Sequence, residues 1–471
     1  MWGHLVRGAC DDEFPSNSSR MRLPAAWAAL VLLAVRVIAA PARPEALVIV
    51  AGDQHSAYER TAQLVGLVDR LKAEHPGLPL AILLDGDTQE YGNVIAQRSH
   101  GAIDFAMYAA LAKRGPTIVN LGNHEPEFYD VAETVRRIVA TGARVVSNIT
   151  DRETGRPFTP ARLKLPLGAQ EITVVGVTTD KLATYRVAIR PSLDLANPVT
   201  WAKSYFPLLL ADATLPVVMS HAGIAADREM LSLVPDGTLF AGAHDHQRFV
   251  EAFGRTVYFH SGSWNSHMSL AWLDRDEAAR PRWTVEQIPV PLEGPADPDL
   301  QALIAKVTTE NLTEAERAVV GHTAGAMGPS EAARFVVAAL RTAAGVDAAF
   351  VGNTTFGAGL PAGEITRLQF DACVRFEGRI FITEVDGVRL KALLAAANLG
   401  PETPFAERKG EFNYAAGPAT IEPGGTYRIA TTDWGARNTE RYFGAPTLTW
   451  HESPGLQLKA EAAAALRSVK K

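Results

Sequence analysis

The sequence predicts an α/β protein, α+β overall, and three observations support this fold class. Apolar runs of strand length recur along the first half of the chain, beginning with residues 46–50 and 80–84. Segments with apolar residues at helical spacing separate these runs. Polar residues of the kinds that bind metals follow several strands directly. Because ligands bind at the carboxyl ends of strands in layered α/β sheets, this pattern indicates a functional edge.

The elements of a first domain can be predicted in order. Strands are expected at 46–50, 80–84, 117–121, 144–146, 171–178, 215–219 and 238–241. Helices are expected at 58–74, 103–113 and 131–141, with a helical or loop segment at 201–211. Short strands with turn residues follow over 248–290, which predicts an antiparallel section that closes the domain.

A second domain is predicted after a proline-rich stretch. Prolines, acidic residues and a glycine in 289–298 are typical of a domain boundary, and 299–308 predict a connector helix. Beyond it, helices are expected at 330–344 and 390–398, and strands at 348–352, 380–385 and 427–431. We therefore predict a first domain at 43–290, a connector at 291–329 and a second domain at 330–471.

The composition is that of an ordinary globular protein. The chain has 471 residues, of which 47% are hydrophobic and 21% charged, enough for two or three domains. The net charge of -6 argues against a nucleic-acid polymer as the partner. The two cysteines, Cys10 and Cys373, offer no disulfide framework, because Cys10 lies in a segment that we expect the mature protein to lack. We expect a monomer that acts on a small molecule.

The N-terminal residues predict export. Residues 1–20 are polar and irregular and are interpreted as a non-native upstream extension, because Met21 opens a short basic region that leads into an apolar stretch. This pattern is typical of a secretory signal peptide at 21–42, with small residues for cleavage at Ala39, Ala40 and Ala42. The alternative is an N-terminal anchor, although the stretch is shorter than the roughly 20 residues of a membrane span. We expect a periplasmic or secreted protein with no stable membrane partner.

Five predicted strands deliver ligand-type residues to their carboxyl ends. These residues are Asp53 with His55, Asp87, Asn123 with His124, His221, and His244 with His246. Carboxylate and imidazole groups together suit Zn, Mn, Fe, Co or Ni, and a central carboxylate can bridge two cations about 3.5–4 Å apart. The pattern therefore predicts a site for two divalent metal ions without selecting among these metals.

The motifs resemble those of the calcineurin-like metallophosphoesterase superfamily: Asp53-x-His55, Gly86-Asp87, Gly122-Asn123-His124-Glu125, His221, and Gly242-Ala243-His244-Asp245-His246. The resemblance implies a four-layer α/β/β/α domain. One metal would be bound by Asp53, His55, Asp87 and His246, and the other by Asp87, Asn123, His221 and His244. Asp87 would be the bridge. A hydroxide between the metals would attack phosphorus, while His124 stabilises the transition state or protonates the leaving group.

A carboxylate orients this histidine in many family members. Here the usual Glu-Phe-Asp is replaced by a segment that holds two acidic candidates, Glu127 and Asp130. Glu127 stands at the family's aspartate position, and Asp130 is the alternative.

The second domain resembles the C-terminal domain of periplasmic 5'-nucleotidases and UDP-sugar hydrolases. The similar segments are 359–366, Phe376, 384–387 and 427–431. In that family two aromatic rings hold the nucleobase, and the resemblance places Phe376 and Trp434 there. The family's arginine-containing element is replaced by Asn353-Thr354-Thr355-Phe356-Gly357, and a later glycine-rich element by Asn438-Thr439-Glu440-Arg441. Compensating or substrate-contacting residues would then be Arg375, Arg379, Arg437, Asn353 and Glu440.

These features favour an exported dimetal phosphohydrolase, a 5'-nucleotidase-like phosphomonoesterase that acts on a nucleotide or a related phosphoester. Two alternatives stay open. One is a catalytically silent binding or scaffold protein of the same fold. The other is an enzyme similar to the thiosulfohydrolases of sulfur oxidation, which share the two-domain architecture and cleave a different anion.

Overall fold

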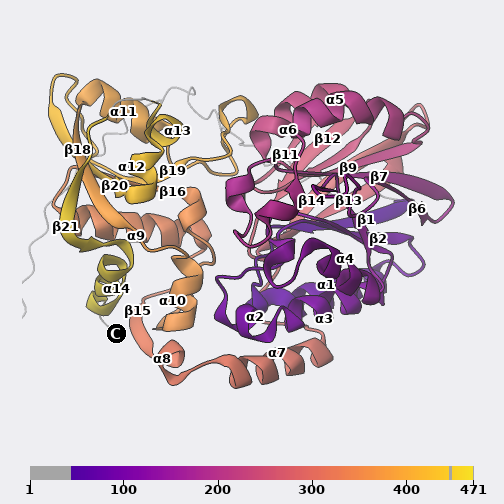
Figure 1. Ribbon diagram of the computed structural model, residues 1–471, viewed down its shortest axis with the longest axis horizontal. Coiled ribbons are helices and arrows are strands. Elements are labelled where there is room, and N and C mark those ends of the chain that lie inside the picture. Colours follow the sequence, from indigo (N-terminus) through magenta and orange to yellow (C-terminus); the bar gives the residue numbers. More distant parts are fainter. Residues whose placement is uncertain (1–43, 445–447, 470–471) are drawn as a thin grey trace, which may run out of the picture. The chain divides into compact units, whose positions relative to one another are not determined.

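The computed structural model of the protein describes residues 44–444 and 448–469 (Figure 1). The predicted extension at 1–20, the predicted signal peptide at 21–42 and Cys10 lie outside this range. Within the range, no helix has both the length and the hydropathy that crossing a bilayer requires.

A first sheet of six strands has the order β14-β13-β1-β2-β3-β4. Its strands are β1 (Ala46–Gly52), β2 (Leu80–Asp85), β3 (Thr117–Asn120), β4 (Arg144–Val146), β13 (His267–Arg275) and β14 (Pro281–Pro289). The four strands β1 to β4 are parallel, whereas β13 is antiparallel to both of its neighbours, β1 and β14. Gly52 pairs with Asp85, and Asp85 with Asn120, so these strands end at the same edge.

A second sheet of six strands has the order β11-β12-β10-β9-β7-β6. Its strands are β6 (Arg162–Leu167), β7 (Gln170–Thr178), β9 (Leu215–His221), β10 (Leu239–Gly242), β11 (Arg248–Phe253) and β12 (Thr256–Ser261). Thr178 pairs with His221, and Gly242 with Ser220, so β7, β9 and β10 also end together. A two-stranded ribbon, β5 (Thr150–Asp151) with β8 (Leu193–Asp194), completes the strands of this part.

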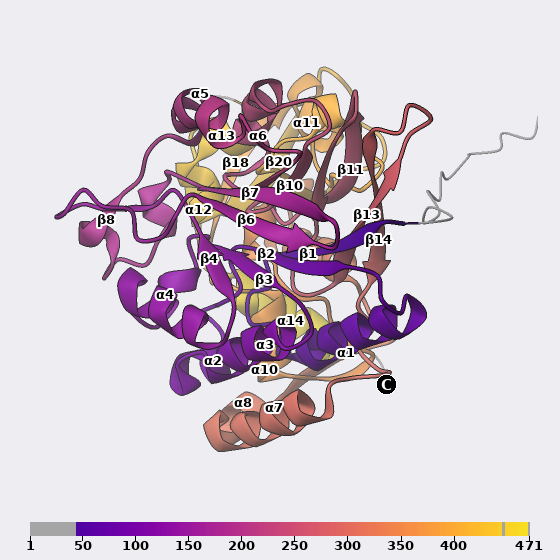
Figure 2. The ribbon, with the colours of Figure 1, turned by 90° about the vertical axis from the view of Figure 1, so that its right-hand side faces the viewer.

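Helices cover the outer face of each sheet, as Figure 2 shows. One group is α1 (Tyr58–Glu74), α2 (Val94–Ser99), α3 (Ala102–Ala112) and α4 (Val131–Ala140), and the other is α5 (Pro198–Leu209) and α6 (Ile224–Met230). Short 3-10 helices lie at η1 (Glu125–Glu127), η2 (Leu182–Thr184), η3 (Arg190–Ser192) and η4 (Leu231–Leu233). The predicted four-layer α/β/β/α architecture is confirmed.

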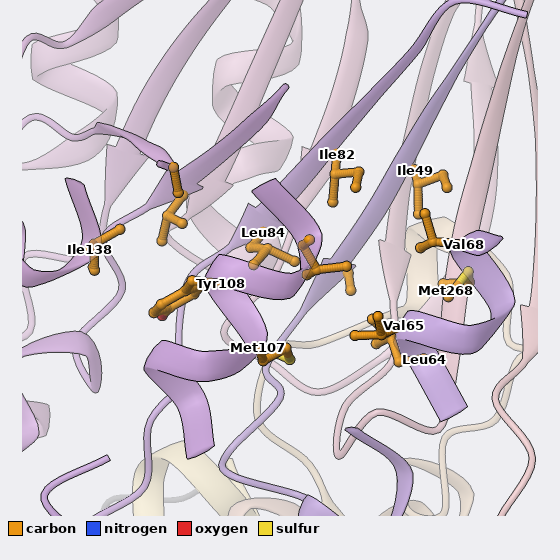
Figure 3. Close-up of a cluster of buried hydrophobic side chains, with 14 of the residues drawn as sticks. Ile49, Leu64, Val65, Val68, Ile82, Leu84, Met107, Tyr108, Ile138 and Met268 are labelled. Carbon is orange, nitrogen blue, oxygen red and sulfur yellow. The ribbon is translucent and has the colours of Figure 1, made fainter. Parts of the chain in front are cut away.

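Three buried clusters hold the layers together, because each sheet buries apolar side chains on both faces. Ile49 and Ile82 of the first sheet pack against α1 and α3 (Figure 3). Their neighbours in sequence, such as Val48 and Leu83, point the other way and pack between the two sheets. A third cluster, around Phe206 of α5, joins the second sheet to its helices.

The remaining chain forms a second α/β part around a five-stranded sheet, β19-β16-β20-β18-β21. Its strands are β16 (Ala348–Gly352), β18 (Arg379–Asp386), β19 (Asn413–Ala416), β20 (Thr426–Thr432) and β21 (His451–Gln457). Its helices are α9 (Pro329–Ala344), α10 (Arg367–Cys373), α11 (Gly387–Ala395), α12 (Asp433–Arg437), α13 (Thr439–Phe443) and α14 (Leu458–Ser468), with η5 (Asn353–Thr355) and η6 (Phe405–Glu407). Cys373 is fully buried, as expected of a small apolar side chain.

The predicted connector contains helices α7 (Pro298–Asn311) and α8 (Glu314–Arg317). It also contains a strand that the sequence analysis did not predict, β15 (Val319–Thr323), which pairs with β17 (Gly363–Thr366). Because of this pairing, residues 319–323 belong to the second part of the chain and are not a free linker.

Candidate metal centre

The loops that follow the strands of both sheets carry the predicted metal ligands. The loops after β1 and β2 are joined by backbone hydrogen bonds: the Asp53 N–H donates to Gly86 O (3.0 Å) and the His55 N–H to Asp87 O (2.8 Å). Five predicted ligands have left-handed backbone conformations: Asp53 (φ 50°), His55 (47°), Asp87 (54°), His244 (81°) and His246 (57°). Such values are uncommon outside glycine and concentrate at functional sites, so the fold holds these side chains against a local backbone cost.

The predicted ligands form two adjacent groups. Ligand atoms of Asp53, His55 and His246 lie within 4.8 Å of one another, and so do those of Asp87, His221 and His244. The Nε2 atoms of His55 and His246 are 2.9 Å apart. His221 Nε2 lies 3.0 Å from Asp87 Oδ2 and 3.9 Å from Asp53 Oδ1. This division matches the two ligand sets that the resemblance implies, while the bridging role of Asp87 stays a prediction.

Buried polar atoms without partners show that this pocket suits cations. Asn123 Oδ1 and His244 Nδ1 are buried and form no hydrogen bond with any described residue. Buried polar atoms nearly always have partners, and an unlocated ion is one explanation of an exception. A Cβ at Gly122 would lie 2.3 Å from Asp87 Oδ1 and 2.9 Å from His221 Nε2, so glycine keeps this space open. Carboxylate, amide and imidazole donors together fit divalent metal ions.

Burial keeps three of the histidines neutral, the form that binds metal. It lowers the pKa of His55 to about 4 and the pKa values of His244 and His246 well below their usual range. His221 differs: burial lowers its pKa, but the carboxylates of Asp87 and Asp53 outweigh this effect and raise the pKa well above the usual value. The carboxylates that favour a proton on His221 also attract a cation.

His124 immediately precedes the short helix η1, and its side chain lies at the same centre. Its Nδ1 lies 2.8 Å from Glu127 Oε1, and its backbone N–H donates to Asp87 Oδ1 (2.7 Å). Burial lowers the pKa of His124, but the carboxylates of Asp87, Glu90 and Glu127 outweigh burial and raise it to about 10. Asp130 lies elsewhere, because its Oδ1 accepts from the Glu133 N–H (2.7 Å) and caps α4. Of the two predicted candidates, Glu127 is the carboxylate that contacts His124.

Three residues at the centre were not assigned by the sequence analysis. Glu90 lies 3.2 Å from His55 Nδ1 and forms an ion pair with Arg375, which is 285 residues away along the chain. Trp264 stacks on His55, with ring centroids 5.1 Å apart. Glu125 accepts hydrogen bonds from the backbone N–H groups of Asp87 (2.9 Å) and Thr88 (2.8 Å) and so fixes the loop after β2. Glu125 ends a recognised motif, whereas no sequence signal marks Glu90 or Trp264.

The predicted substrate residues differ from one another in burial and in the contacts that they make. Phe376 and Trp434 are half-exposed, at 53% and 48%. Asn353 is buried: its Oδ1 accepts from the Phe412 N–H (3.2 Å). The other charged candidates are held by ion pairs or lie on the surface: Arg375 pairs with Glu90, Arg379 with Glu452, Arg437 with Asp433, and Glu440 is exposed on α13.

Two cavities adjoin the centre. The larger, of about 460 Å³, is lined by Glu90, Trp264, Arg375 and Phe376 and by apolar side chains of α7 and α10. The smaller, of about 320 Å³, is lined by the predicted ligand His246 and by Asn353. Trp434 lines neither cavity.

Comparison with known proteins identifies the second part of the chain. Residues 308–420 match the family model described as "5'-nucleotidase, C-terminal domain". No curated protein sequence matches the chain.

Solved structures resemble nearly the whole chain. A 5'-nucleotidase precursor from Thermus thermophilus is 17% identical with a TM-score of 0.59, covering 90% of this chain and 96% of that one. The Thermus thermophilus sulfate thiohydrolase SoxB is 15% identical with a TM-score of 0.62, covering 91% and 95%. A 5'-nucleotidase from Candida albicans is 11% identical with a TM-score of 0.57, covering 91% and 100%.

At these identities the structural likeness establishes the fold, and the family match establishes the domain. The resemblance predicted from the motifs is confirmed at this level: residues 308–420 match the 5'-nucleotidase C-terminal domain, and the chain has the fold of the two-domain 5'-nucleotidases, which the sulfate thiohydrolase shares.

Proposed function

We propose that the chain is a dimetal hydrolase of small phosphoesters, most similar in activity to a 5'-nucleotidase. The observation that carries the proposal is the convergence of six predicted ligands from four strand ends, with Asn123 Oδ1 and His244 Nδ1 buried and unpartnered among the described residues. A binding or scaffold protein has no need of these buried, strained polar groups. The scaffold alternative is therefore disfavoured.

The side chains at this centre have two proposed roles: some hold the metals, and others act on the substrate. When bound, two divalent cations would supply positive charge that activates water and offsets charge on the phosphoryl oxygens. The His244 N–H donates to Asp53 Oδ2 (2.9 Å), so this hydrogen bond joins the loops after β1 and β10 and holds the carboxylate in place. Glu127 occupies Nδ1 of His124, which leaves Nε2 to donate to the departing oxygen. Removing Glu127 would free the ring to turn away.

A sulfur ester is the second candidate substrate, and two observations favour keeping it. The fold is shared with a protein named a sulfate thiohydrolase. In addition, Arg375 forms an ion pair with Glu90, and Asn353 accepts a hydrogen bond from the Phe412 backbone. Two residues that were predicted to contact a nucleotide therefore already have partners within the protein. The phosphoester ranks first because a dimetal centre with an adjacent histidine suits in-line attack at phosphorus.

A substrate screen with metal-loaded protein separates these candidates. We expect inorganic phosphate to be released from at least one of AMP, a UDP-sugar and phenyl phosphate, with Mn, Zn or Co supplied in turn. Release of sulfate from a carrier-bound thiosulfonate, with no phosphate from any ester, would favour the second candidate. Metal binding without turnover of any of these compounds would favour the scaffold.

Two further proposals concern the whole protein. We infer export to the periplasm or beyond the cell from the segment 21–42, and we infer a monomer that acts without a stable membrane partner. Mass spectrometry of the exported protein tests the first, since cleavage would leave a new N-terminus near Ala40 or Ala42. Light scattering of the purified chain tests the second.

A further inference from the structure

The smaller cavity contains an arginine with no partner. Arg248 begins β11, two residues after the predicted ligand His246, and both residues line this cavity of about 320 Å³. Arg248 is partly buried, and its backbone pairs with Ser261 in the sheet, yet its guanidinium forms no hydrogen bond or ion pair with any residue in 44–444 or 448–469. A guanidinium has five N–H donors in a planar fork that matches oxyanions. An unpaired arginine beside a metal site is therefore available for an anionic ligand.

A second arginine in the same cavity is buried without a carboxylate. Arg408 is 3% exposed, and its guanidinium donates only to neutral acceptors, Gln247 Oε1 (3.2 Å) and Pro401 O (2.7 Å). Its Nε has no partner among the described residues. The guanidinium also lies over the Phe249 ring, 4.4 Å from the centroid, but no carboxylate forms an ion pair with it. Because a buried cation is costly without a directly paired opposite charge, a bound anion would stabilise Arg408.

The start of a long helix adds to this positive environment. Gly328, Pro329 and Ser330 line the cavity at the N-terminus of α9, a helix of 16 residues. Helix N-termini favour anions because their backbone N–H groups lack partners and the helix dipole is positive there. Glu331 is the acidic residue of the lining; its carboxylate accepts from the Gly328 N–H (2.8 Å) and offsets part of the positive charge at this helix end. The lining also holds two arginines, Arg248 and Arg408, and neither forms an ion pair with a carboxylate among the described residues.

We propose that this cavity binds a second anionic group of the substrate, separate from the phosphoryl group that is cleaved. The inference rests on the proposed function, because His246 belongs both to the cavity lining and to one predicted metal group. A substrate that reaches from the metals into the cavity carries a phosphate, sulfonate or carboxylate there. The substrate class is thus a phosphoester with a distal anion rather than a simple monoester.

A matched pair of substrate series tests the proposal. Alkyl phosphates of two to six carbons end either in a methyl group or in a sulfonate, so that only one ester bond can be cleaved in each. We expect the metal-loaded enzyme to favour one sulfonate chain length. Arg248→Gln should raise KM for that compound about 10- to 100-fold, the loss of one charged hydrogen-bonded contact, and change the methyl series less than twofold. Arg248→Lys should recover part of the loss.

The control is Arg255→Gln, which removes a partly exposed arginine paired with Asp236 at the other end of the β11–β12 hairpin. It should leave both series unchanged. Equal KM changes in the two series for Arg248→Gln would overturn the proposal.

A binding measurement separates failure of this inference from failure of the proposed function. Inorganic sulfate is titrated into the full chain in the presence of a chelator, so that metals do not contribute. We expect sulfate to bind, and Arg248→Gln to weaken binding about 10-fold or more. The same sulfate affinity in both proteins would overturn the anion site. Loss of affinity in the variant, with no turnover of any phosphoester by the wild type, would support the anion site and reject the phosphoesterase.

Discussion

The two parts of the chain differ in how they hold their predicted functional residues. In the first part, most of the predicted ligands are buried, several have left-handed backbone conformations, and polar atoms such as Asn123 Oδ1 lack partners among the described residues. In the second part, Phe376 and Trp434 are half-exposed, and Asn353 and Arg375 make ordinary structural contacts. The difference indicates that the fold holds the predicted metal ligands of the first part in place. Substrate recognition would then depend on residues outside the family's motifs.

The largest effects are expected at the metal centre. Asp87→Ala removes a carboxylate that contacts His221 and the backbone of His124, and we expect activity to be abolished. His124→Ala should lower kcat by about 10²- to 10⁴-fold, the usual contribution of a general acid. Steady-state kinetics on the best substrate of the screen measures both, with circular dichroism to check folding. Unchanged turnover in both variants would show that the chemistry lies elsewhere.

The next effect separates Glu127 from Asp130. Glu127→Gln should lower kcat about 10- to 100-fold, because the amide holds the ring of His124 less firmly than the carboxylate does. Asp130→Asn is the matched control: it retains a capping side chain on α4 and should leave kcat within about twofold, with stability changed by no more than about 1 kcal/mol. A larger kcat loss for Asp130→Asn would reverse the assignment.

Glu90 links the two parts through one carboxylate. Its contact with His55 Nδ1 presents Nε2 toward the centre, so Glu90→Gln should weaken metal binding about 10- to 100-fold. Isothermal titration with Mn or Co measures this change. Glu316→Gln, which breaks a similar ion pair with Arg98 on the protein surface, should not alter metal affinity. Identical affinities in the two variants would show that Glu90 has no positioning role.

The sequence predicted the fold and most of the centre for physical reasons. The ligands of the first part follow strands whose apolar runs mark their position, so Asp53, Asp87 and Asn123 could be placed together from the order of residues alone. Glu90 could not, because its role depends on Arg375, which only folding brings to it. The choice between Glu127 and Asp130 depended on the turn at η1, which the sequence did not predict. Strand β15 was missed inside a segment that looked like a linker.

A smaller effect tests the aromatic pair of the second part. If these rings hold a nucleobase, Phe376→Ala and Trp434→Ala should each raise KM for AMP by roughly 10-fold, the value of stacking one base. KM for phenyl phosphate, which has no nucleobase, should stay unchanged in both variants. Phe253→Ala removes another partly exposed ring, at 40%, and serves as the control. Equal changes with AMP and phenyl phosphate would rule out a base clamp.

The smallest effect concerns a buried carboxyl group beneath the loop after β1. Asp104 accepts from Tyr58 OH (2.7 Å) and Ser56 Oγ (3.2 Å), and burial raises its pKa to about 7 despite these hydrogen bonds. The folded protein therefore binds a proton that the unfolded chain has released, and this group's contribution to stability is lost as pH rises from about 4 to about 7. Asp104→Asn should remove up to about 1.4 kcal/mol per pH unit of that dependence, measured by urea unfolding across the range. The same pH dependence in both proteins would contradict the assignment.

The central claim is that loops from five strands enclose two divalent cations. Metal content of the purified, metal-saturated full chain, measured by inductively coupled plasma mass spectrometry after removal of free metal, tests it directly. We expect two ions per chain, and fewer in a variant that combines Asn123→Ala with His244→Ala. A wild-type chain that retains no divalent ion would contradict the claim.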